Sequence, residues 1–115
     1  MGIKLLVVDD EAYVTQMVSH SLQKAGHTVI VAGDGKEAFE LACRELPDLI
    51  VSDYQMPVLD GLGLAAMLKE NIPTCRMPII LLTAWLTSIF VVASTRQTEY
   101  CFGSVFDAMR IAFAA

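Results

Sequence analysis

The chain has 115 residues, 55% of them hydrophobic and 18% charged, and a formal net charge of −5 at pH 7. This length and composition predict one folded domain that buries a core without metal or disulfide staples, and they exclude a disordered chain. The acidic balance disfavours unaided binding to nucleic acid, which requires clustered lysine and arginine. It suits a protein that handles cations through carboxylates.

The cysteines Cys43, Cys75 and Cys101 are odd in number and form no C-x-x-C pair. The sequence also shows no signal peptide and no apolar run near the ~20 residues that a membrane span requires. This pattern is typical of reduced thiols in a soluble protein. We therefore expect a cytoplasmic protein that does not bind membranes.

Short apolar runs alternate with segments of helical periodicity through the first 84 residues. The predicted strands are residues 3–8, 27–32, 48–53 and 77–83. The predicted helices between them are residues 12–25, 36–46 and 62–70. Continuous apolar runs indicate strands buried on both faces, and the alternation predicts an α/β fold around a parallel sheet with right-handed crossovers.

The last third of the chain is less regular. Continuing the alternation requires a helix at 87–97, a strand at 99–103 and a helix at 106–113. The run SIFVVAS at 88–94 is rich in β-branched and aromatic residues, which favour a strand instead. The length expected of such a fold favours the helix, and the helix is our prediction.

Three aspartates follow two of the predicted strands. Asp9 and Asp10 come after the first strand, and Asp53 ends the third. If these strands are neighbours, three carboxylates converge at the edge where parallel sheets bind ligands. Their repulsion would be relieved by a hard divalent cation such as Mg²⁺, which prefers oxygen ligands. Thr83, at the end of the fourth predicted strand, would add a hydroxyl that donates to a phosphoryl oxygen.

The alternative for each acid is a purely structural role. A single strand-end acid, such as Asp34 or Asp48, most often caps the helix or turn that follows it. An adjacent pair with a third acid at an equivalent strand end favours a site over a set of caps.

Three stretches are similar, in order and spacing, to the receiver domain of two-component response regulators: VVDDE at 7–11, DLIVSDYQMPVLDGLGL at 48–64 and MPIILLTA at 77–84. The run D-x-x-M-P-x-x-D-G from Asp53 to Gly61 is their most specific part. The resemblance implies a flavodoxin-like, doubly wound parallel sheet of five strands, in the order 2-1-3-4-5, with about five helices. It implies one receiver domain over 1–115, typical over 1–84 and atypical over 85–115.

The resemblance also implies a function. The family residue matching Asp53 takes a phosphoryl group from a phosphohistidine, in a domain that assists this reaction without being a turnover enzyme. By the same resemblance, Asp10 and Asp53 bind Mg²⁺ directly, Asp9 acts mainly through water, and the backbone carbonyl of Gln55 is a further ligand. Thr83 matches the switch hydroxyl that responds to phosphorylation.

Two family features of the last third can be compared with this sequence. The aromatic residue that moves with the switch corresponds to Tyr100 or Phe102, for which core packing is an equal alternative. The lysine expected near 103–105, which pairs with the phosphoryl group, is missing, because the four lysines of the chain end at Lys69. The segment after Ala84 is thus either a diverged end or foreign sequence, for example from a frameshift.

Two functional hypotheses follow. The first is a stand-alone phosphoacceptor that is phosphorylated on Asp53 by a sensor histidine kinase or phosphotransfer protein and switches its binding to a downstream effector. The second is a degenerate receiver that acts only as an interaction or dimerisation module, with a homodimer formed by exchange of C-terminal elements as one route. A small Mg²⁺-dependent phosphohydrolase is disfavoured, since no second catalytic acid stands in the usual position after Asp53. Neither hypothesis names the kinase, the pathway or the effector.

Overall fold

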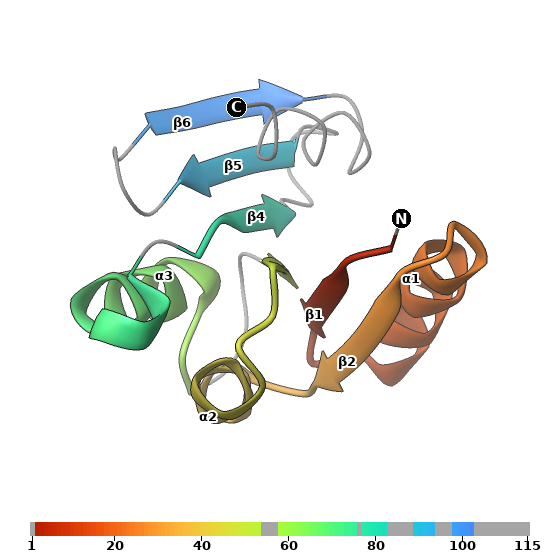
Figure 1. Cartoon of the computed structure of the whole chain (residues 1–115), viewed down its shortest axis with the longest axis horizontal. Coiled ribbons are helices and arrows are strands. Elements are labelled where there is room, and N and C mark those ends of the chain that lie inside the picture. Colours follow the sequence, from red (N-terminus) through yellow and green to blue (C-terminus); the bar gives the residue numbers. More distant parts are fainter. Residues whose placement is uncertain (1, 54–57, 76, 83–88, 94–97, 103–115) are drawn as a thin grey trace.

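A six-stranded sheet in the order β2-β1-β3-β4-β5-β6 organises the chain (Figure 1). The computed structural model describes residues 2–53, 58–75, 77–82, 89–93 and 98–102. The strands are β1 (Lys4–Val8), β2 (Thr28–Ala32), β3 (Leu49–Asp53), β4 (Ile79–Leu82), β5 (Ile89–Ala93) and β6 (Thr98–Phe102). The helices are α1 (Ala12–Lys24), α2 (Gly35–Glu45), α3 (Gly61–Glu70) and the short 3₁₀ helix η1 (Ile72–Thr74).

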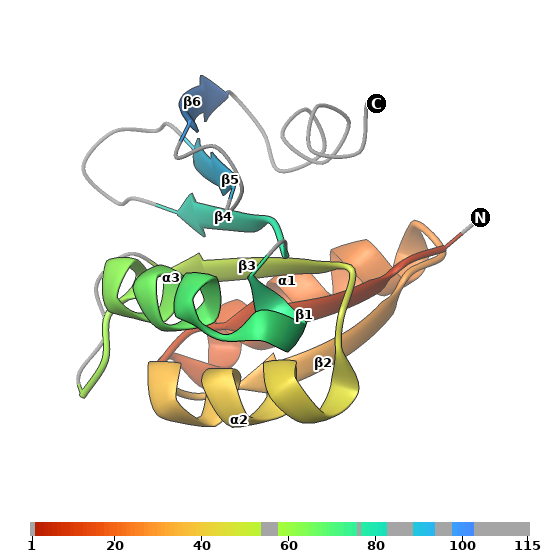
Figure 2. The same cartoon turned by 60° about the vertical axis from the view of Figure 1, so that its left-hand side comes forward.

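The first four strands are parallel. β1 pairs with β2 on one side and with β3 on the other, and β3 pairs with β4. Helix α1 lies on one face of the sheet, whereas α2 and α3 lie together on the opposite face (Figure 2). The predicted α/β architecture and the order 2-1-3-4 of its parallel strands are confirmed.

The core is divided by the sheet into two layers, because successive side chains of a strand point to opposite faces. Leu6, Val8 and Ile50 pack in the layer beneath α2 and α3. Leu5, Val7 and Val51 pack in the other layer, together with Leu22 of α1. Both faces of β1 and β3 are therefore buried, which is why their sequences are continuous apolar runs.

Side-chain caps fix where the second and third helices begin. Asp34 accepts a hydrogen bond from the backbone N–H of Glu37 at 2.8 Å, and Asp60 accepts one from that of Gly63 at 2.7 Å. α2 ends at Leu46, which has a left-handed backbone with φ of 47°. Among the described helices, none is long and apolar enough to cross a membrane.

The structure corrects the prediction for the last third. Residues 89–93 form strand β5 instead of part of a helix over 87–97, and β5 runs antiparallel to β4. The β-branched content of IFVVA, which favours a strand, outweighs the expected alternation. β6 occupies nearly the predicted strand at 99–103, but it pairs antiparallel with β5. The described sheet therefore has six strands instead of five, while the predicted helix at 106–113 lies outside the described residues.

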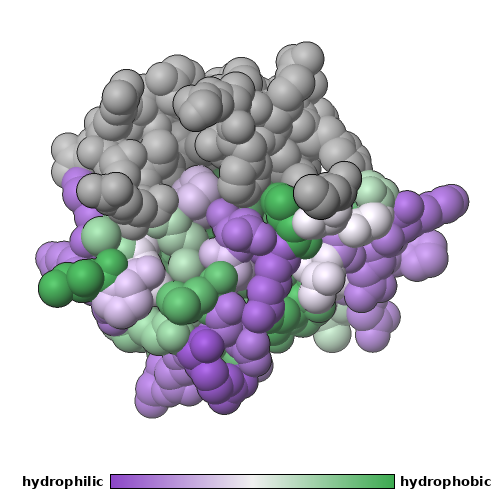
Figure 3. Space-filling model, viewed as in Figure 1, coloured by the Kyte–Doolittle hydropathy of each residue, from purple (hydrophilic) through white to green (hydrophobic). Residues whose placement is uncertain are grey.

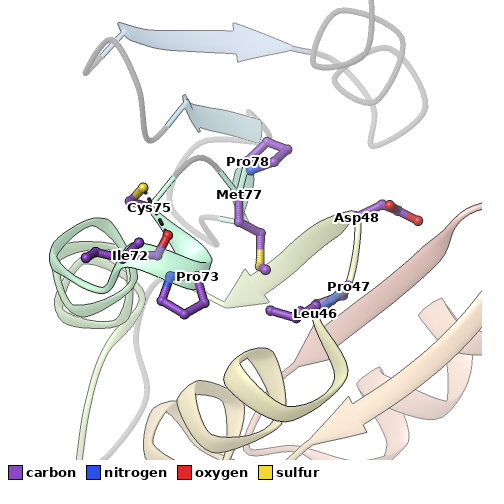
Figure 4. Close-up of a pocket in the computed structure, with 8 residues that line it drawn as sticks. All are labelled: Leu46, Pro47, Asp48, Ile72, Pro73, Cys75, Met77 and Pro78. Atoms are coloured by element: carbon purple, nitrogen blue, oxygen red, sulfur yellow. Dashed lines mark hydrogen bonds between the residues drawn. The ribbon is translucent and has the colours of Figure 1, made fainter.

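The surface over the described helices mixes hydrophilic residues with smaller hydrophobic areas (Figure 3). Two exposed apolar side chains, Tyr13 and Met17, lie one turn apart on α1, and Ile72 of η1 is the most exposed large hydrophobic residue among those described. A hollow of about 560 Å³ opens near Ile72, between the end of α2 and the start of β4 (Figure 4). Its lining consists of Leu46, Pro47, Asp48, Ile72, Pro73, Cys75, Met77 and Pro78.

One buried hydroxyl in α1 leads to a stability prediction. The Oγ atom of Ser19 is buried and has no hydrogen-bond partner. An unsatisfied buried polar group costs about 1–3 kcal/mol, and alanine is also the better helix former. We expect Ser19→Ala to raise the free energy of unfolding by about 1 kcal/mol or more, as measured by urea denaturation.

Ser21→Ala is the matched control, because Ser21 is exposed on the same helix and reports helix propensity alone. Equal gains for the two variants would show that the buried hydroxyl of Ser19 carries no penalty.

Candidate functional site

Three carboxylates gather at one edge of the parallel sheet. Asp9 and Asp10 directly follow β1, and Asp53 is the last residue of β3. The register pairs Val8 with Ser52, so the two strands end side by side. One oxygen from each of the three carboxylates lies within 4.8 Å of the others. The convergence expected from neighbouring strands is therefore present, and this acidic cluster consists of Asp9, Asp10 and Asp53.

The members of the cluster differ in exposure. Asp9 is buried, Asp53 is partly buried and Asp10 is exposed. Asp9 is held on both sides: its N–H donates to the carbonyl of Ala32 at 3.2 Å, and its Oδ1 accepts from the N–H of Glu11 at 2.9 Å. The cluster thus has a fixed, buried member and a member open to solvent.

The pKa of Asp9 is raised from 3.8 to about 6, chiefly by burial and to a lesser extent by the neighbouring Asp53 and Asp10, against the hydrogen bond from Glu11, which lowers it. Negative charge on the neighbours and removal from water both disfavour the carboxylate form. A divalent cation coordinated by these oxygens would reverse that balance, and the all-oxygen donor set fits Mg²⁺. Asp9, Asp10 and Asp53 are the described residues that would hold it.

Other predicted site residues fall outside what the structure describes. Gln55 and Thr83 lie outside the described residues, as do the positions 103–105 where the family lysine was expected. For Tyr100 and Phe102 the structure describes the backbone alone, as part of β6. The roles predicted for these residues remain predictions.

The loop that follows the cluster touches the start of α2. A Cβ atom added to Gly35 would collide with the backbone carbonyl oxygen of Leu59. Glycine is therefore required here for the close approach of two backbones. This contact is not predicted by the sequence, since GDG at 33–35 indicates a turn without indicating what the turn packs against.

Val58, in the same loop, has a left-handed backbone with φ of 72°. This conformation is unfavourable for a β-branched residue. The Val58 side chain is 83% exposed, so burial does not compensate for the strain.

Comparison with known proteins decides the family. The sequence matches the family described as "Response regulator receiver domain" over residues 5–99. The chain belongs to this family. It is 42% identical over 84 residues to the alkaline phosphatase synthesis transcriptional regulatory protein PhoP of Bacillus subtilis, covering 73% of this chain and 34% of that protein. It is 40% identical over 81 residues to the probable transcriptional regulator ycf27 of Guillardia theta, covering 70% and 31%. The receiver domain thus spans about a third of the length of these relatives.

Solved structures agree with this assignment. The chemotaxis protein CheY4 of Vibrio cholerae superposes with a TM-score of 0.67 at 38% identity, covering 70% of this chain and 68% of that one. The receiver domain of the sensor histidine kinase PA1611 of Pseudomonas aeruginosa PAO1 superposes with a TM-score of 0.69 at 32% identity, covering 73% and 69%. That structure has a magnesium ion coordinated in its active-site cleft.

The raised pKa of Asp9 makes the stability of the receiver domain depend on pH. A carboxyl whose pKa in the folded state exceeds its unfolded value stabilises the fold when protonated, and this contribution is lost as pH rises through about 6. We expect Asp9→Asn, which retains the acceptor for Glu11, to stabilise the metal-free domain at about pH 7 and to have less effect at about pH 4.

Urea denaturation in the presence of a chelator at the two pH values measures this difference. Asp34→Asn serves as the control, because asparagine caps a helix as well as aspartate does. A destabilising effect of Asp9→Asn at neutral pH would contradict the repulsion inferred for the cluster.

The strain at Val58 leads to a third stability prediction for the receiver domain. Asparagine tolerates the left-handed conformation, which costs other residues about 1–2 kcal/mol. Val58→Asn should therefore raise the free energy of unfolding by about 1 kcal/mol. Thermal and urea unfolding would measure the gain, and Val58→Ala should gain less, because alanine lacks the polar side chain whose local hydrogen bonds let asparagine adopt this conformation.

Proposed function

We propose that this receiver domain is a phosphoacceptor, phosphorylated on Asp53 in a Mg²⁺-dependent reaction. The proposal is carried by one observation: carboxylates from the ends of two adjacent parallel strands lie within 4.8 Å of one another. Negative charges that are close together and partly buried destabilise the folded state unless a bound cation offsets them. The magnesium ion in the related PA1611 structure supports the same assignment.

The partial burial of Asp53 suits a nucleophile that reacts with a large donor. An oxygen of its carboxylate forms a bond to phosphorus while the bond from phosphorus to the donor's imidazole nitrogen breaks, and the electron pair of that bond leaves with the imidazole. Bound Mg²⁺ would offset the negative charge on carboxylate and phosphoryl oxygens. Asp9 and Asp10 act by holding this ion beside Asp53. The domain is itself the product of the transfer, so we do not class it as a turnover enzyme.

The donor in this proposal is a sensor histidine kinase or a phosphotransfer protein, and the output is altered binding to an effector protein. We propose that the domain acts as a stand-alone receiver without contacting nucleic acid itself. The net charge of −5 supports this, since phosphate backbones attract basic surfaces. The longer transcriptional regulators among its relatives leave an attached output domain as the alternative.

In a second hypothesis, the domain has the receiver fold but is not switched by phosphorylation. The chain has no lysine after Lys69, and beyond β4 the described sheet continues as antiparallel pairs, β5 with β4 and β6 with β5. Under this hypothesis the domain is an interaction module, including a homodimer that exchanges C-terminal elements. Sedimentation with and without a phosphodonor tests this second hypothesis, because a fixed module forms the same dimer in both conditions, whereas a dimer that forms or dissociates only on phosphorylation contradicts it.

Phosphorylation itself is tested with a small phosphodonor. We expect the purified chain, incubated with Mg²⁺ and acetyl phosphate, to gain one phosphoryl group that intact-mass spectrometry detects. Asp53→Asn should abolish the gain, because an amide is not a nucleophile at phosphorus under these conditions. Omitting Mg²⁺ should have the same effect.

Asp34→Asn is again the matched control, since it makes the same chemical change at a helix cap outside the cluster. Equal labelling of the wild-type chain and Asp53→Asn would refute the proposal.

A further inference from the structure

Ser52 is a buried polar residue next to Asp53. It is fully buried in β3, where the other buried residues, Leu49, Ile50 and Val51, are all apolar. Its register partners are also apolar, namely Val8 in β1 and Leu81 in β4. Valine would therefore pack at this position as well as serine does, so packing alone does not explain the buried hydroxyl.

The hydroxyl has one specific partner. Oγ of Ser52 donates a hydrogen bond to the backbone carbonyl oxygen of Asp53 at 2.9 Å. The contrast with Ser19 is informative, since the buried hydroxyl of Ser19 lacks any partner. Of these two buried serines, the one that precedes the acidic cluster is the one whose hydroxyl is engaged.

This hydrogen bond acts where the strand ends. Asp53 is the last residue of β3, so no further strand residue holds its carbonyl group in line. A donor from the preceding side chain restrains the peptide plane that follows Asp53, and with it the ψ angle of that residue. Because the side-chain rotamers that a residue can adopt depend on its φ and ψ angles, the restraint extends to the carboxylate of Asp53.

We propose that Ser52 is a positioning residue for the acidic cluster, which holds Asp53 in the orientation that binds Mg²⁺ together with Asp9 and Asp10. The inference rests on the proposed function of Asp53. Ser52 touches neither the ion nor the phosphoryl group, and acts through the backbone of its neighbour. Its loss should weaken metal binding and slow phosphorylation while leaving a folded domain.

The test compares Ser52→Thr with Ser52→Val. These variants have nearly the same shape, and only threonine retains the hydroxyl, so their difference isolates the hydrogen bond from packing. We expect the affinity for Mg²⁺, measured by isothermal titration calorimetry, to be about three- to tenfold weaker in the valine variant than in the threonine variant. The rate of labelling by acetyl phosphate at subsaturating Mg²⁺ should fall in the same order.

Ser52→Cys and Ser52→Ala repeat the comparison without branching at Cβ, in case a branched side chain does not fit. The cysteine thiol is a poor donor of nearly the same shape, so both variants should lose Mg²⁺ affinity relative to the wild type. Urea denaturation identifies the folded variants, and Ser19→Ala reports the effect of deleting a buried hydroxyl elsewhere.

The outcomes separate the two proposals. Wild-type protein that neither binds Mg²⁺ nor accepts a phosphoryl group overturns the proposed function, and the role of Ser52 with it. Wild-type protein that does both, with equal Mg²⁺ affinity in folded threonine and valine variants, overturns the role of Ser52 alone. If the valine variant does not fold, cysteine and alanine variants that bind Mg²⁺ like the wild type overturn it equally.

Discussion

The parallel pairing of β1 with β3 is the constraint on which the candidate site depends. Parallel neighbours end at the same edge, and the pairing of Val8 with Ser52 places the aspartates that follow them within reach of one another. Both strands are buried on two faces, so a slip in register would break the contacts of two core layers at once. The packing of apolar side chains thus determines the positions of charged groups that take no part in it.

The clustering of carboxylates opposes the stability of the fold. The raised pKa of Asp9 shows that the carboxylate form of this group is less stable in the folded chain than it is in water. A metal ion that binds the folded state alone would return stability that grows with the logarithm of its concentration once the site is mostly occupied. Function and folding are therefore linked through the same three side chains.

The sequence was most informative where one local pattern had one physical cause. The apolar runs ending at Val8 and Asp53 predicted buried parallel strands, and the acids after them predicted the edge where they meet. The strand at Ile89–Ala93 was not predicted, because the expected alternation of strands and helices placed a helix there. The preference of its β-branched residues for a strand proved decisive. The contact of Gly35 with Leu59 and the hydrogen bond of Ser52 depend on how distant or adjacent backbones are oriented, which residue patterns do not encode.

The close approach of Gly35 to Leu59 has a mechanical consequence. With no side chain between them, the backbone of Gly35 in the first turn of α2 meets that of Leu59 directly. The start of α2 therefore cannot shift toward Leu59 without displacing it.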